Sequence, residues 1–472
     1  MTDVVVIGAG PAGVMASIRA ADLGARTTLL TSGAFGGMAA NDGPVPVRTL
    51  AHAARLMREA RQLSAYGITV GQPVLDYGAL LARVADVVRN VGRNSALRAQ
   101  ADAAGVMVFE GEGRVRFVDA HTIETAAGRR VLADKVILCT GGKSRKLSIP
   151  GFELTATHSD AWSLSATPVS MLVIGSGATG AQVTSVFNAF GAKVQLFEAG
   201  PRILRTEEPE ISACVAAAFR AAGVVIHEDF GTIDAFEPTT GGVRMIYTKD
   251  GERKSAEAAL VVSAVGWTGD TDALNLKSVG VEIDDRGFVR TEAHLQTTAP
   301  HVFAAGDVTG KRMLAPQALH AGVLAATNAV LGRTEPAVHP VNPIGSFTDP
   351  EYAQVGLGEA QAREMGDVAV ASVGFDETTR AIIDGRTMGL CKLIVDRRSR
   401  AILGCHIVGE RAVDVAQIAA VAMASRMTVD ELARIPLSFP TYAGVLGRAA
   451  AVAARDVNRD LGASTLSAPD YA

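Results

Sequence analysis

Two glycine-rich stretches have the residue types and the spacing that hold the phosphates of a dinucleotide. The first reads VVVIGAGPAG over 4–13, and the second reads MLVIGSGATG over 171–180. In each, an apolar run suited to a buried parallel strand ends in G-x-G-x-x-G, whose glycines allow a tight turn, a close pyrophosphate and close helix–strand packing. The phosphates would lie at the N-terminus of the following helix. The predicted phosphate-binding residues are Gly8, Gly10 and Gly13 in the first copy and Gly175, Gly177 and Gly180 in the second.

The two copies also agree in where their second strands end. Thr31 follows Gly8 by 23 residues, and Glu198 follows Gly175 by the same 23 residues. A dinucleotide-binding fold places its ribose-binding residue at this point, so the repeat predicts two bound dinucleotides. Glu198 is expected to accept hydrogen bonds from the ribose hydroxyls and to repel a 2′-phosphate, which predicts NADH over NADPH. Arg202 is the alternative, because it could turn toward a phosphate.

Composition restricts the classes of protein to which the chain can belong. Of its 472 residues 48% are hydrophobic and 20% charged, which is typical of globular proteins. The net charge of −4 argues against electrostatic binding of nucleic acid. The longest apolar stretch, near 415–424, is far shorter than the ~20 residues of a membrane span, and a core strand starting at Val4 leaves no room for a signal peptide. The four cysteines (139, 214, 391 and 405) lack metal-ligand spacing, so we expect no metal and a reduced, cytoplasmic protein.

The elements that must position the glycine turns can be placed from periodicity and turn residues. Helices are expected over 14–23, 49–65, 76–104 and 210–222, and from 315 onward. Strands are expected over 27–30, 193–197, 259–266, 345–355, 368–375, 389–396 and 402–408, with a hairpin over 232–247.

The segment after Thr31 carries a resemblance to a known family. It reads GAFGGMAANDGPVPVR over 33–48 and resembles the motif G-G-x-C-x4-C-x-P-x-K of the flavoprotein pyridine nucleotide–disulfide oxidoreductases. That family includes dihydrolipoamide dehydrogenase, mercuric reductase, glutathione reductase and the soluble transhydrogenase. Here Ala39 and Pro44 stand where the family has its redox cysteines, and Arg48 stands at the family lysine.

Further segments resemble the parts of this family that bind its cofactors. Residues 136–142 are similar to the strand beneath the FAD, 301–308 to the second FAD motif, and 259–266 to a strand of the NAD domain. In the second FAD motif the resemblance gives Asp307 the role of accepting a hydrogen bond from a ribityl hydroxyl. The resemblance predicts one further NAD-binding residue, Gly266. It also predicts further FAD-binding residues: Thr31, Gly36, Gly37, Arg48, Gly113, Thr140, Gly141, Gly142, Gly306, Asp307 and Ala315.

Thr31 departs from the family pattern, because FAD-binding members usually carry Glu there for the adenosine ribose. A threonine offers one hydroxyl in place of a charged acceptor, and a lost charged hydrogen bond costs about 1.5–3 kcal/mol. We therefore expect FAD to be retained, with a lower affinity than in relatives.

The resemblance implies an α/β fold of two Rossmann-like domains, for FAD and NAD, plus a C-terminal α+β dimerisation domain and hence a homodimer. The expected segments are 1–150 (FAD domain, first part), 151–268 (NAD(H) domain), 269–339 (FAD domain, second part), 340–462 (dimerisation domain) and 463–472 (tail).

The last motif of the family is also altered. The family ends its dimerisation domain with H-P-T-x-x-E, delivered to the partner's flavin, whereas 439–444 reads F-P-T-Y-A-G, with Phe439 for the acid–base His and Gly444 for Glu. Because both the dithiol and the acid–base pair of the family are missing, we expect that this chain carries out no dithiol chemistry. Gln182 and Arg48 replace a Glu–Lys pair near flavin N5. The candidate catalytic residues lining the flavin are Arg48, Gln182, Phe439 and Tyr442.

Three functions are compatible with these residues. The first is a FAD-dependent NADH oxidoreductase that passes electrons directly from reduced flavin to a small acceptor, with quinones as the leading candidates. The acceptor would enter an apolar slot walled by Ala39, Pro44, Phe439 and Tyr442. The second is a soluble transhydrogenase, since those enzymes also depart from the family at a Cys and at the His. The third is a non-catalytic flavoprotein that serves as a binding or sensing module.

Overall fold

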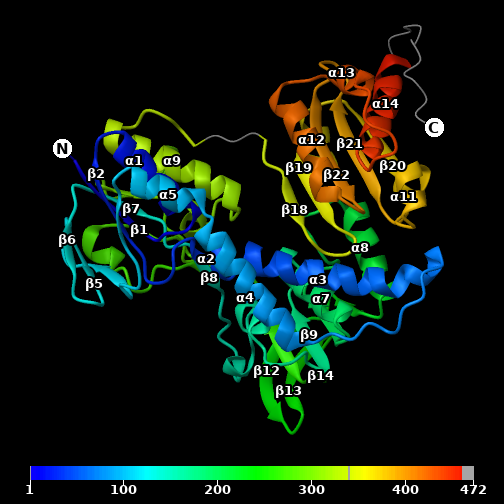
Figure 1. The fold of residues 1–472 in the computed structure, drawn as a ribbon, viewed down its shortest axis with the longest axis horizontal. Helices are drawn as coiled ribbons and strands as arrows, with labels where there is room; N and C mark the ends of the chain where they lie inside the picture. Colours follow the sequence, from blue (N-terminus) through cyan, green and yellow to red (C-terminus); the bar gives the residue numbers. More distant parts are fainter. Residues whose placement is uncertain (1, 338–340, 460–472) are drawn as a thin grey trace. The chain divides into compact units, whose positions relative to one another are not determined.

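The computed structural model describes residues 2–337 and 341–459, and the chain divides into two compact units (Figure 1). The first unit is built from Met1–Leu50, Asp76–Lys146 and Val265–Val338, and the second from Ala51–Leu75, Leu147–Ala264 and His339–Ala472. Each unit has a parallel sheet and a three-stranded antiparallel sheet, and the second unit has a five-stranded antiparallel sheet as well. The expected α/β fold with two Rossmann-like sheets and a C-terminal α+β part is confirmed. The segment boundaries stay a prediction, and the expected tail, 463–472, lies outside the described residues.

The parallel sheet of the first unit has the strand order β17-β7-β1-β2-β3. Its strands are β1 (Asp3–Ile7), β2 (Arg26–Leu30), β3 (Met107–Phe109), β7 (Lys135–Leu138) and β17 (Val302–Ala304). All four strand pairs are parallel, and apolar side chains are buried on both faces. Because the strands run in one direction, the loops after them meet at one edge of the sheet, where ligands of such folds bind.

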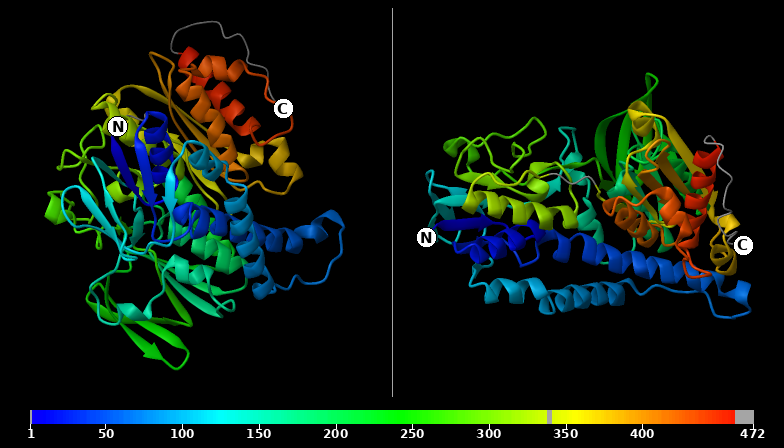
Figure 2. Two further views of the ribbon diagram at one scale, coloured as in Figure 1. Left: turned by 60° about the vertical axis from the view of Figure 1, so that its left-hand side comes forward. Right: turned by 90° about the horizontal axis from the view of Figure 1, so that it is seen from above.

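Helices cover one face of this sheet, and a small antiparallel sheet lies against the other. The helices are α1 (Pro11–Asp22), α5 (Ala96–Ala103) and α9 (Ala315–Leu331), and the small sheet is β4 (Val115–Phe117), β5 (Thr122–Thr125) and β6 (Arg130–Leu132). Figure 2 shows α9 lying along α1. A Cβ at Gly322 of α9 would lie 2.1 Å from the Ala12 carbonyl oxygen of α1, so these two backbones are in direct contact.

The second unit repeats the parallel arrangement with the strand order β11-β10-β9-β15. Its strands are β9 (Ser170–Ile174), β10 (Lys193–Glu198), β11 (Val225–Glu228) and β15 (Leu260–Ser263), with helices α7 (Ala178–Ala189) and α8 (Pro209–Ala221). The expected hairpin over 232–247 is the first part of a three-stranded sheet of β12 (Thr232–Thr239), β13 (Gly242–Lys249) and β14 (Glu252–Ala258).

The antiparallel sheet of the second unit has the order β18-β19-β22-β21-β20. Its strands are β18 (Ile344–Ser346), β19 (Tyr352–Gly356), β20 (Val368–Gly374), β21 (Leu390–Asp396) and β22 (Ile402–Val408). Helices α12 (Ala412–Ala424), α13 (Val429–Arg434) and α14 (Gly444–Arg459) pack against it (Figure 1), largely through buried alanines.

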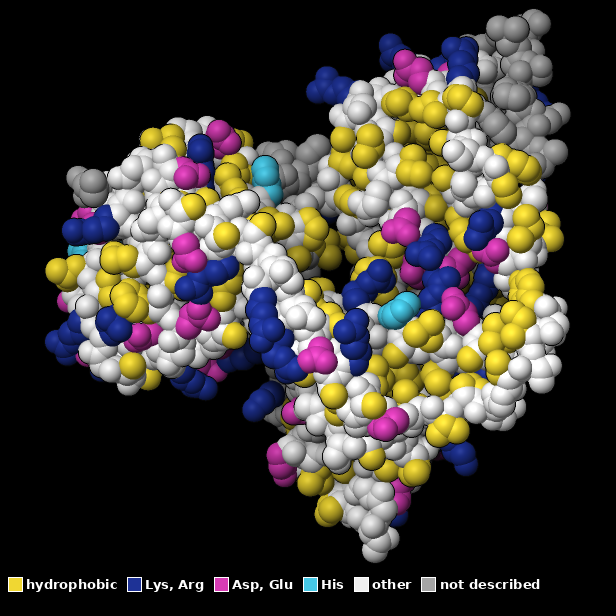
Figure 3. All heavy atoms as spheres, viewed as in Figure 1, with side chains coloured by type: hydrophobic (Ala, Val, Ile, Leu, Met, Phe, Trp, Pro, Cys, Tyr) yellow, Lys and Arg dark blue, Asp and Glu magenta, His cyan; other side chains and the backbone are white. Residues whose placement is uncertain are grey.

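Ion pairs join the later turns of α3 (Pro44–Gln62) to the loops around the antiparallel sheet, all within the second unit. The Arg55 Nη1 to Glu410 Oε1 distance is 2.6 Å, and Arg58 Nε lies 2.5 Å from an Asp349 oxygen. Arg386 lies 3.7 Å from the same Asp349 oxygen. Basic and acidic side chains accordingly gather beside α3 on the surface (Figure 3).

The remaining elements are α2 (Gly37–Asn41), α4 (Tyr77–Arg93), α6 (His158–Trp162), α10 (Glu359–Met365), α11 (Thr379–Ile383), β8 (Gly142–Ser144) and β16 (Trp267–Gly269).

Two expected elements are wrong as single pieces. The helix expected over 76–104 is broken into α4 and α5 at Asn94 and Ser95, where the Asn94 side chain donates to the Asn90 carbonyl at 2.9 Å. Such local bonds compete with helix continuation. The strand expected over 345–355 is two antiparallel strands, β18 and β19, with Pro350 in the connection. Proline has no N–H to donate to a strand ladder, which accounts for the break.

None of the helices in the described part of the chain has the length and the apolar character that a membrane span requires.

The contact between α1 and α9 yields a stability test. Gly322→Ala should destabilise the protein by about 1–3 kcal/mol, because the added methyl meets backbone rather than a movable side chain. Gly92→Ala is the matched control: it is also a helix glycine, but its added methyl would meet nothing within 4 Å. That control should be stabilising by up to about 1 kcal/mol. Denaturant unfolding of both variants measures this, and equal effects of the two would contradict the packing described.

Candidate cofactor sites and the pocket at Phe439

The first and third glycines of each dinucleotide turn are in backbone contact. A Cβ at Gly13 would lie 1.7 Å from the Gly8 carbonyl oxygen, and a Cβ at Gly180 would lie 1.8 Å from that of Gly175. Gly8 and Gly175 also have positive φ angles, +105° and +92°. No other residue type fits these positions, and the two turns have the same geometry in their separate units.

The middle glycines leave room for an anion. Gly10 and Gly177 cap α1 and α7 without any side-chain hydrogen bond at the cap. A Cβ built on either one has no heavy atom within 4 Å outside its chain neighbours. The N-termini of both helices therefore present backbone N–H groups toward open space, as a pyrophosphate requires.

Two polar groups near the first turn fit FAD. The Thr140 hydroxyl is buried, and it has no hydrogen-bond partner among the described residues. The Asp307 carboxylate likewise accepts no hydrogen bond from the described part of the chain, and burial raises its pKa to about 6. A Cβ at Gly306 would come within 2.9 Å of the Ala12 methyl, so the strand end that carries Asp307 is held against α1. A ribityl hydroxyl would satisfy the buried carboxylate.

The glycine pair of the next segment lies on the first turn. The Gly36 N–H donates to the Ala9 carbonyl at 2.8 Å, and a Cβ at Gly37 would lie 2.7 Å from Gly10 Cα. Ala39 follows on α2, where a redox cysteine would stand in the family. These contacts place the segment beside the first dinucleotide turn.

The other FAD-side residues lie at the carboxyl edge of the same sheet or in its loops. Gly141 and Gly142 follow β7, and a Cβ at Gly142 would lie 3.7 Å from Asp307 Cβ. Ala315 begins α9, and Gly113 lies in the turn before β4. Gly266, assigned above to NAD, belongs to the first unit, and its carbonyl accepts from the Arg145 N–H at 2.9 Å.

The end of β3, beside Thr31, holds an acidic residue that the sequence analysis did not single out. Thr31 is buried, and its backbone bonds to the segment after β3 through Phe109 and Glu112. Glu110 follows β3 directly, beside Thr31. An acidic residue immediately after the third strand of a dinucleotide fold was the available signal.

In the second unit, Glu198 is held at the turn by three donors. One of its oxygens accepts from the Ser176 N–H (3.1 Å) and hydroxyl (2.6 Å), and the other accepts from the Gly200 N–H (2.8 Å). Arg202 donates to three carbonyls, those of residues 204, 205 and 207, at 2.8–3.1 Å. Arg202 is thus occupied with capping backbone, while the side chain of Arg205 lies against Gly200.

Two of the four candidate flavin-lining residues make local contacts. Gln182, on α7, donates to the Ala178 carbonyl of its own helix at 3.1 Å. The Tyr442 hydroxyl donates to Asp384 at 2.8 Å, and the same Asp384 oxygen accepts from Arg380 at 2.8 Å. Arg48 is exposed on α3 in the first unit, so its pairing with Gln182 stays a prediction.

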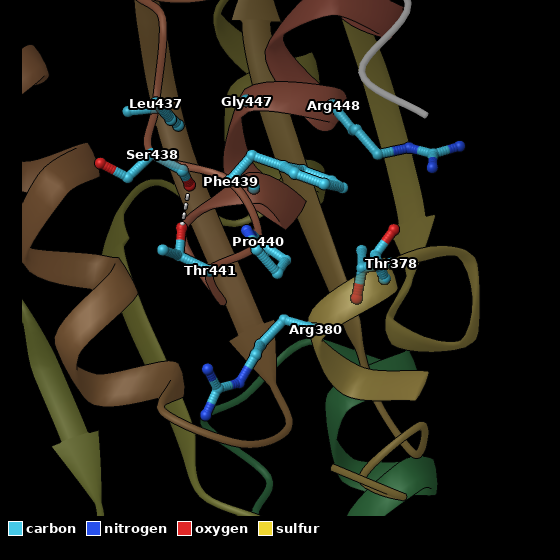
Figure 4. A pocket seen from close by; sticks show the side chains of 11 residues that line it. Thr378, Arg380, Leu437, Ser438, Phe439, Pro440, Thr441, Gly447 and Arg448 are labelled. Atoms are coloured by element: carbon cyan, nitrogen blue, oxygen red, sulfur yellow. Dashed lines mark hydrogen bonds between the residues drawn. The ribbon is translucent and has the colours of Figure 1, made fainter. Parts of the chain in front are cut away.

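Phe439 lies in a pocket of the second unit. The lining residues come from α11, from the segment before α14 and from the first turns of α14: Thr378, Thr379, Arg380, Leu437, Ser438, Phe439, Pro440, Thr441, Gly444, Gly447 and Arg448. The Phe439 ring is 65% exposed and extends toward the side where Thr378 and Arg448 lie (Figure 4). Thr441 fixes the segment by donating to the Ser438 carbonyl at 2.7 Å. Tyr442, expected to wall the acceptor slot, is not among the lining residues.

The cysteines are poor candidates for redox chemistry. Cys139 is buried and its pKa is raised to about 12, while burial also raises the pKa of Cys214. Cys391 and Cys405 have sulfurs 4.0 Å apart in the core of the antiparallel sheet, and the hydrogen bond with Cys405 and burial raise the pKa of Cys391. Within the described residues, no three His, Cys, Asp or Glu side chains are grouped so that they could hold a metal ion.

Asp307→Asn tests the fit to FAD. At pH 7.5 this variant should bind FAD about 10- to 100-fold more weakly, since a charged acceptor is lost. The wild-type affinity should fall as the pH is lowered through about 6, because the carboxyl becomes protonated and accepts less well. The variant should show no such pH dependence. Flavin fluorescence titration of apoprotein measures both, and unchanged affinity in the variant would contradict the assignment.

Nucleotide preference tests the arrangement at Glu198. We expect kcat/KM for NADH to exceed that for NADPH at least tenfold, and Glu198→Gln to narrow this ratio, because the repulsion of a 2′-phosphate is removed. Arg202→Ala should leave the ratio unchanged, since Arg202 is bound to carbonyls. A wild-type preference for NADPH that disappears in Arg205→Ala would reverse the assignment and identify Arg205 as a phosphate ligand.

Comparison with known proteins agrees with this geometry. The family model described as pyridine nucleotide-disulphide oxidoreductase matches residues 2–322, and the model of its dimerisation domain matches 342–450.

Dihydrolipoyl dehydrogenase from Zymomonas mobilis is 32% identical to this chain, and the match covers 93% of this chain and 95% of that enzyme's length. Mercuric reductase from Bacillus cereus is 30% identical over 97% of this chain and 72% of its own. The HOCl-induced flavoprotein disulfide reductase RclA from Escherichia coli superposes with a TM-score of 0.83 at 23% identity, covering 95% of this chain and 99% of its own, which shows a shared fold. The chain belongs to the pyridine nucleotide-disulphide oxidoreductases, NAD(P)H-dependent flavoprotein enzymes that use FAD and NAD(H).

Proposed function

We propose that this protein is a FAD-dependent NADH oxidoreductase that passes electrons directly to a small acceptor of the quinone type, without disulfide chemistry. It acts as a homodimer, in line with its match to the family's dimerisation domain. The overall reaction balances as NADH, a proton and a quinone giving NAD⁺ and a quinol. FAD, when bound, supplies the two-electron redox chemistry of this reaction.

The observation that carries the proposal is the exposed apolar ring of Phe439 in its pocket. In the family that this chain resembles, the corresponding position holds the acid–base His that serves dithiol chemistry. Phe439 can neither donate nor accept a proton, but together with Leu437 and Pro440 it offers an apolar surface to a flat ring. Such a surface suits a quinone better than a charged thiol substrate.

The positions of the sulfur atoms support the same proposal. Ala39 and Pro44 stand at the two family cysteine positions. The four cysteines of the chain lie elsewhere, and three of them are buried. A buried thiol with a raised pKa is a poor nucleophile, because the thiolate is the reactive form. Neither Cys139 nor the pair Cys391 and Cys405 is therefore a substitute for the missing redox pair.

Phe439→His tests the acceptor. A polar, titratable ring at this position should lower quinone turnover severalfold, because a bound quinone would cover the imidazole and leave it unpaired, at a cost of about 1–3 kcal/mol. The rate of flavin reduction by NADH should stay nearly unchanged, because in this family the nicotinamide approaches the opposite ring face. Phe439→Leu is the matched control and should retain more quinone turnover than the His variant.

Two outcomes would contradict the proposal. Recovery of disulfide reductase activity in Phe439→His, or a reductive titration that consumes four electrons per FAD, would demand a second redox centre. Wild-type protein that exchanges hydride between NADPH and an NAD analogue faster than it reduces any quinone would instead identify a transhydrogenase.

A further inference from the structure

The end of β2 lacks the acid that a dinucleotide-binding fold uses for the adenosine ribose. Thr31 stands there, 6% exposed. Its backbone is fully used, because its N–H donates to the Phe109 carbonyl at 3.0 Å and its carbonyl accepts from the Glu112 N–H at 3.1 Å. Any carboxylate that binds the ribose is therefore supplied by another element.

The neighbouring strand places a carboxylate at this edge. In the parallel pair of β2 and β3, Leu30 is opposite Phe109, so Thr31 and Glu110 are the next residues of their strands. Adjacent strands lie about 4.8 Å apart, which brings the two residues side by side beyond the sheet. The acid that is missing at Thr31 is thus present one strand away.

The hydrogen bonds of Glu110 show on which side its carboxylate lies. One oxygen accepts from the Phe35 N–H at 2.9 Å, in the loop that leads from Thr31 to the glycine pair. The other oxygen pairs with Arg98 of α5, whose guanidinium lies 5.4 Å from the Phe35 ring centroid. The same loop bonds to the first dinucleotide turn through Gly36. The carboxylate therefore lies between β3 and the loop that borders the pyrophosphate turn.

Glu112, the other acid after β3, is not available for this role. Its two oxygens accept from the Thr125 hydroxyl at 2.8 Å and from Arg129 Nε at 3.0 Å. The side chain is buried against the small antiparallel sheet. Among these two acids, Glu110 is the exposed one.

We propose that Glu110 accepts the hydrogen bonds of the adenosine ribose hydroxyls of FAD, in place of the missing acid at Thr31. A carboxylate has about four lone-pair sites, and the Phe35 N–H and Arg98 leave sites for the ribose. Those two partners also hold the side chain in one orientation before the cofactor arrives. The proposal concerns the cofactor alone and does not depend on which acceptor the enzyme uses.

The test compares FAD with an analogue that carries 2′-deoxyadenosine, using flavin fluorescence titration of apoprotein. Wild-type protein should bind the analogue about tenfold more weakly than FAD, because one charged hydrogen bond is absent. Glu110→Gln should bind FAD about tenfold more weakly than wild type and should bind the two flavins within twofold of each other. Thr31→Glu in the Glu110→Gln protein should restore both the affinity and the discrimination.

Asp102→Asn is the matched control, since Asp102 of α5 also pairs with Arg98, at 3.2 Å, but does not lie at the sheet edge. It should leave the ratio of the two affinities as in wild type. If Glu110→Gln weakens the binding of FAD and the binding of the analogue by the same factor, Glu110 only supports the loop at Phe35 and the proposal is wrong. Wild-type protein that binds both flavins equally would overturn it without any variant.

Discussion

The structure depends on a backbone-to-backbone contact that occurs twice. In each dinucleotide turn the third glycine lies so close to the carbonyl of the first that a methyl group would clash with it. A Cβ built on Gly13, for example, would lie only 1.7 Å from the Gly8 carbonyl oxygen. That contact lets α1 and α7 start directly at the ends of β1 and β9. It therefore fixes where two helix N-termini are located, and these are the places where the expected pyrophosphates would bind.

The rest of the first unit builds outward from that turn. Helix α9 approaches α1 at Gly322, and the strand end before Asp307 approaches α1 at Gly306. The loop at Gly36 hydrogen-bonds to the backbone of the turn. Each of these contacts involves a glycine, because each brings a second backbone or a small side chain to a place with no room for more. The polar groups left unsatisfied there, at Thr140 and Asp307, are those that a flavin cofactor would satisfy.

The chemistry of the family is changed at positions where the scaffold is unaffected. Ala39 keeps its place on α2, and Phe439 keeps an exposed place in its pocket. Exchanging a thiol or an imidazole for an apolar side chain at exposed or half-exposed positions does not disturb the packed sheets. Under the proposed function, few substitutions in this fold redirect electron transfer from thiols to another acceptor.

The sequence alone determined the two glycine turns, the strands leading into them and the α/β class, because close-packed turns and buried strands leave a local pattern of glycines and apolar runs. Tertiary structure decided what depends on residues far apart in the chain. The break of the expected helix at Asn94 is a local exception, because it follows from a side-chain bond to Asn90 that periodicity does not reveal. Glu110 lies beside Thr31 only because β3 is the neighbour of β2 in the sheet. Likewise Tyr442 bonds to Asp384, 58 residues away, rather than remaining free to wall a slot. Strand order and side-chain partners over such separations are set by packing of the whole unit, which no short segment encodes.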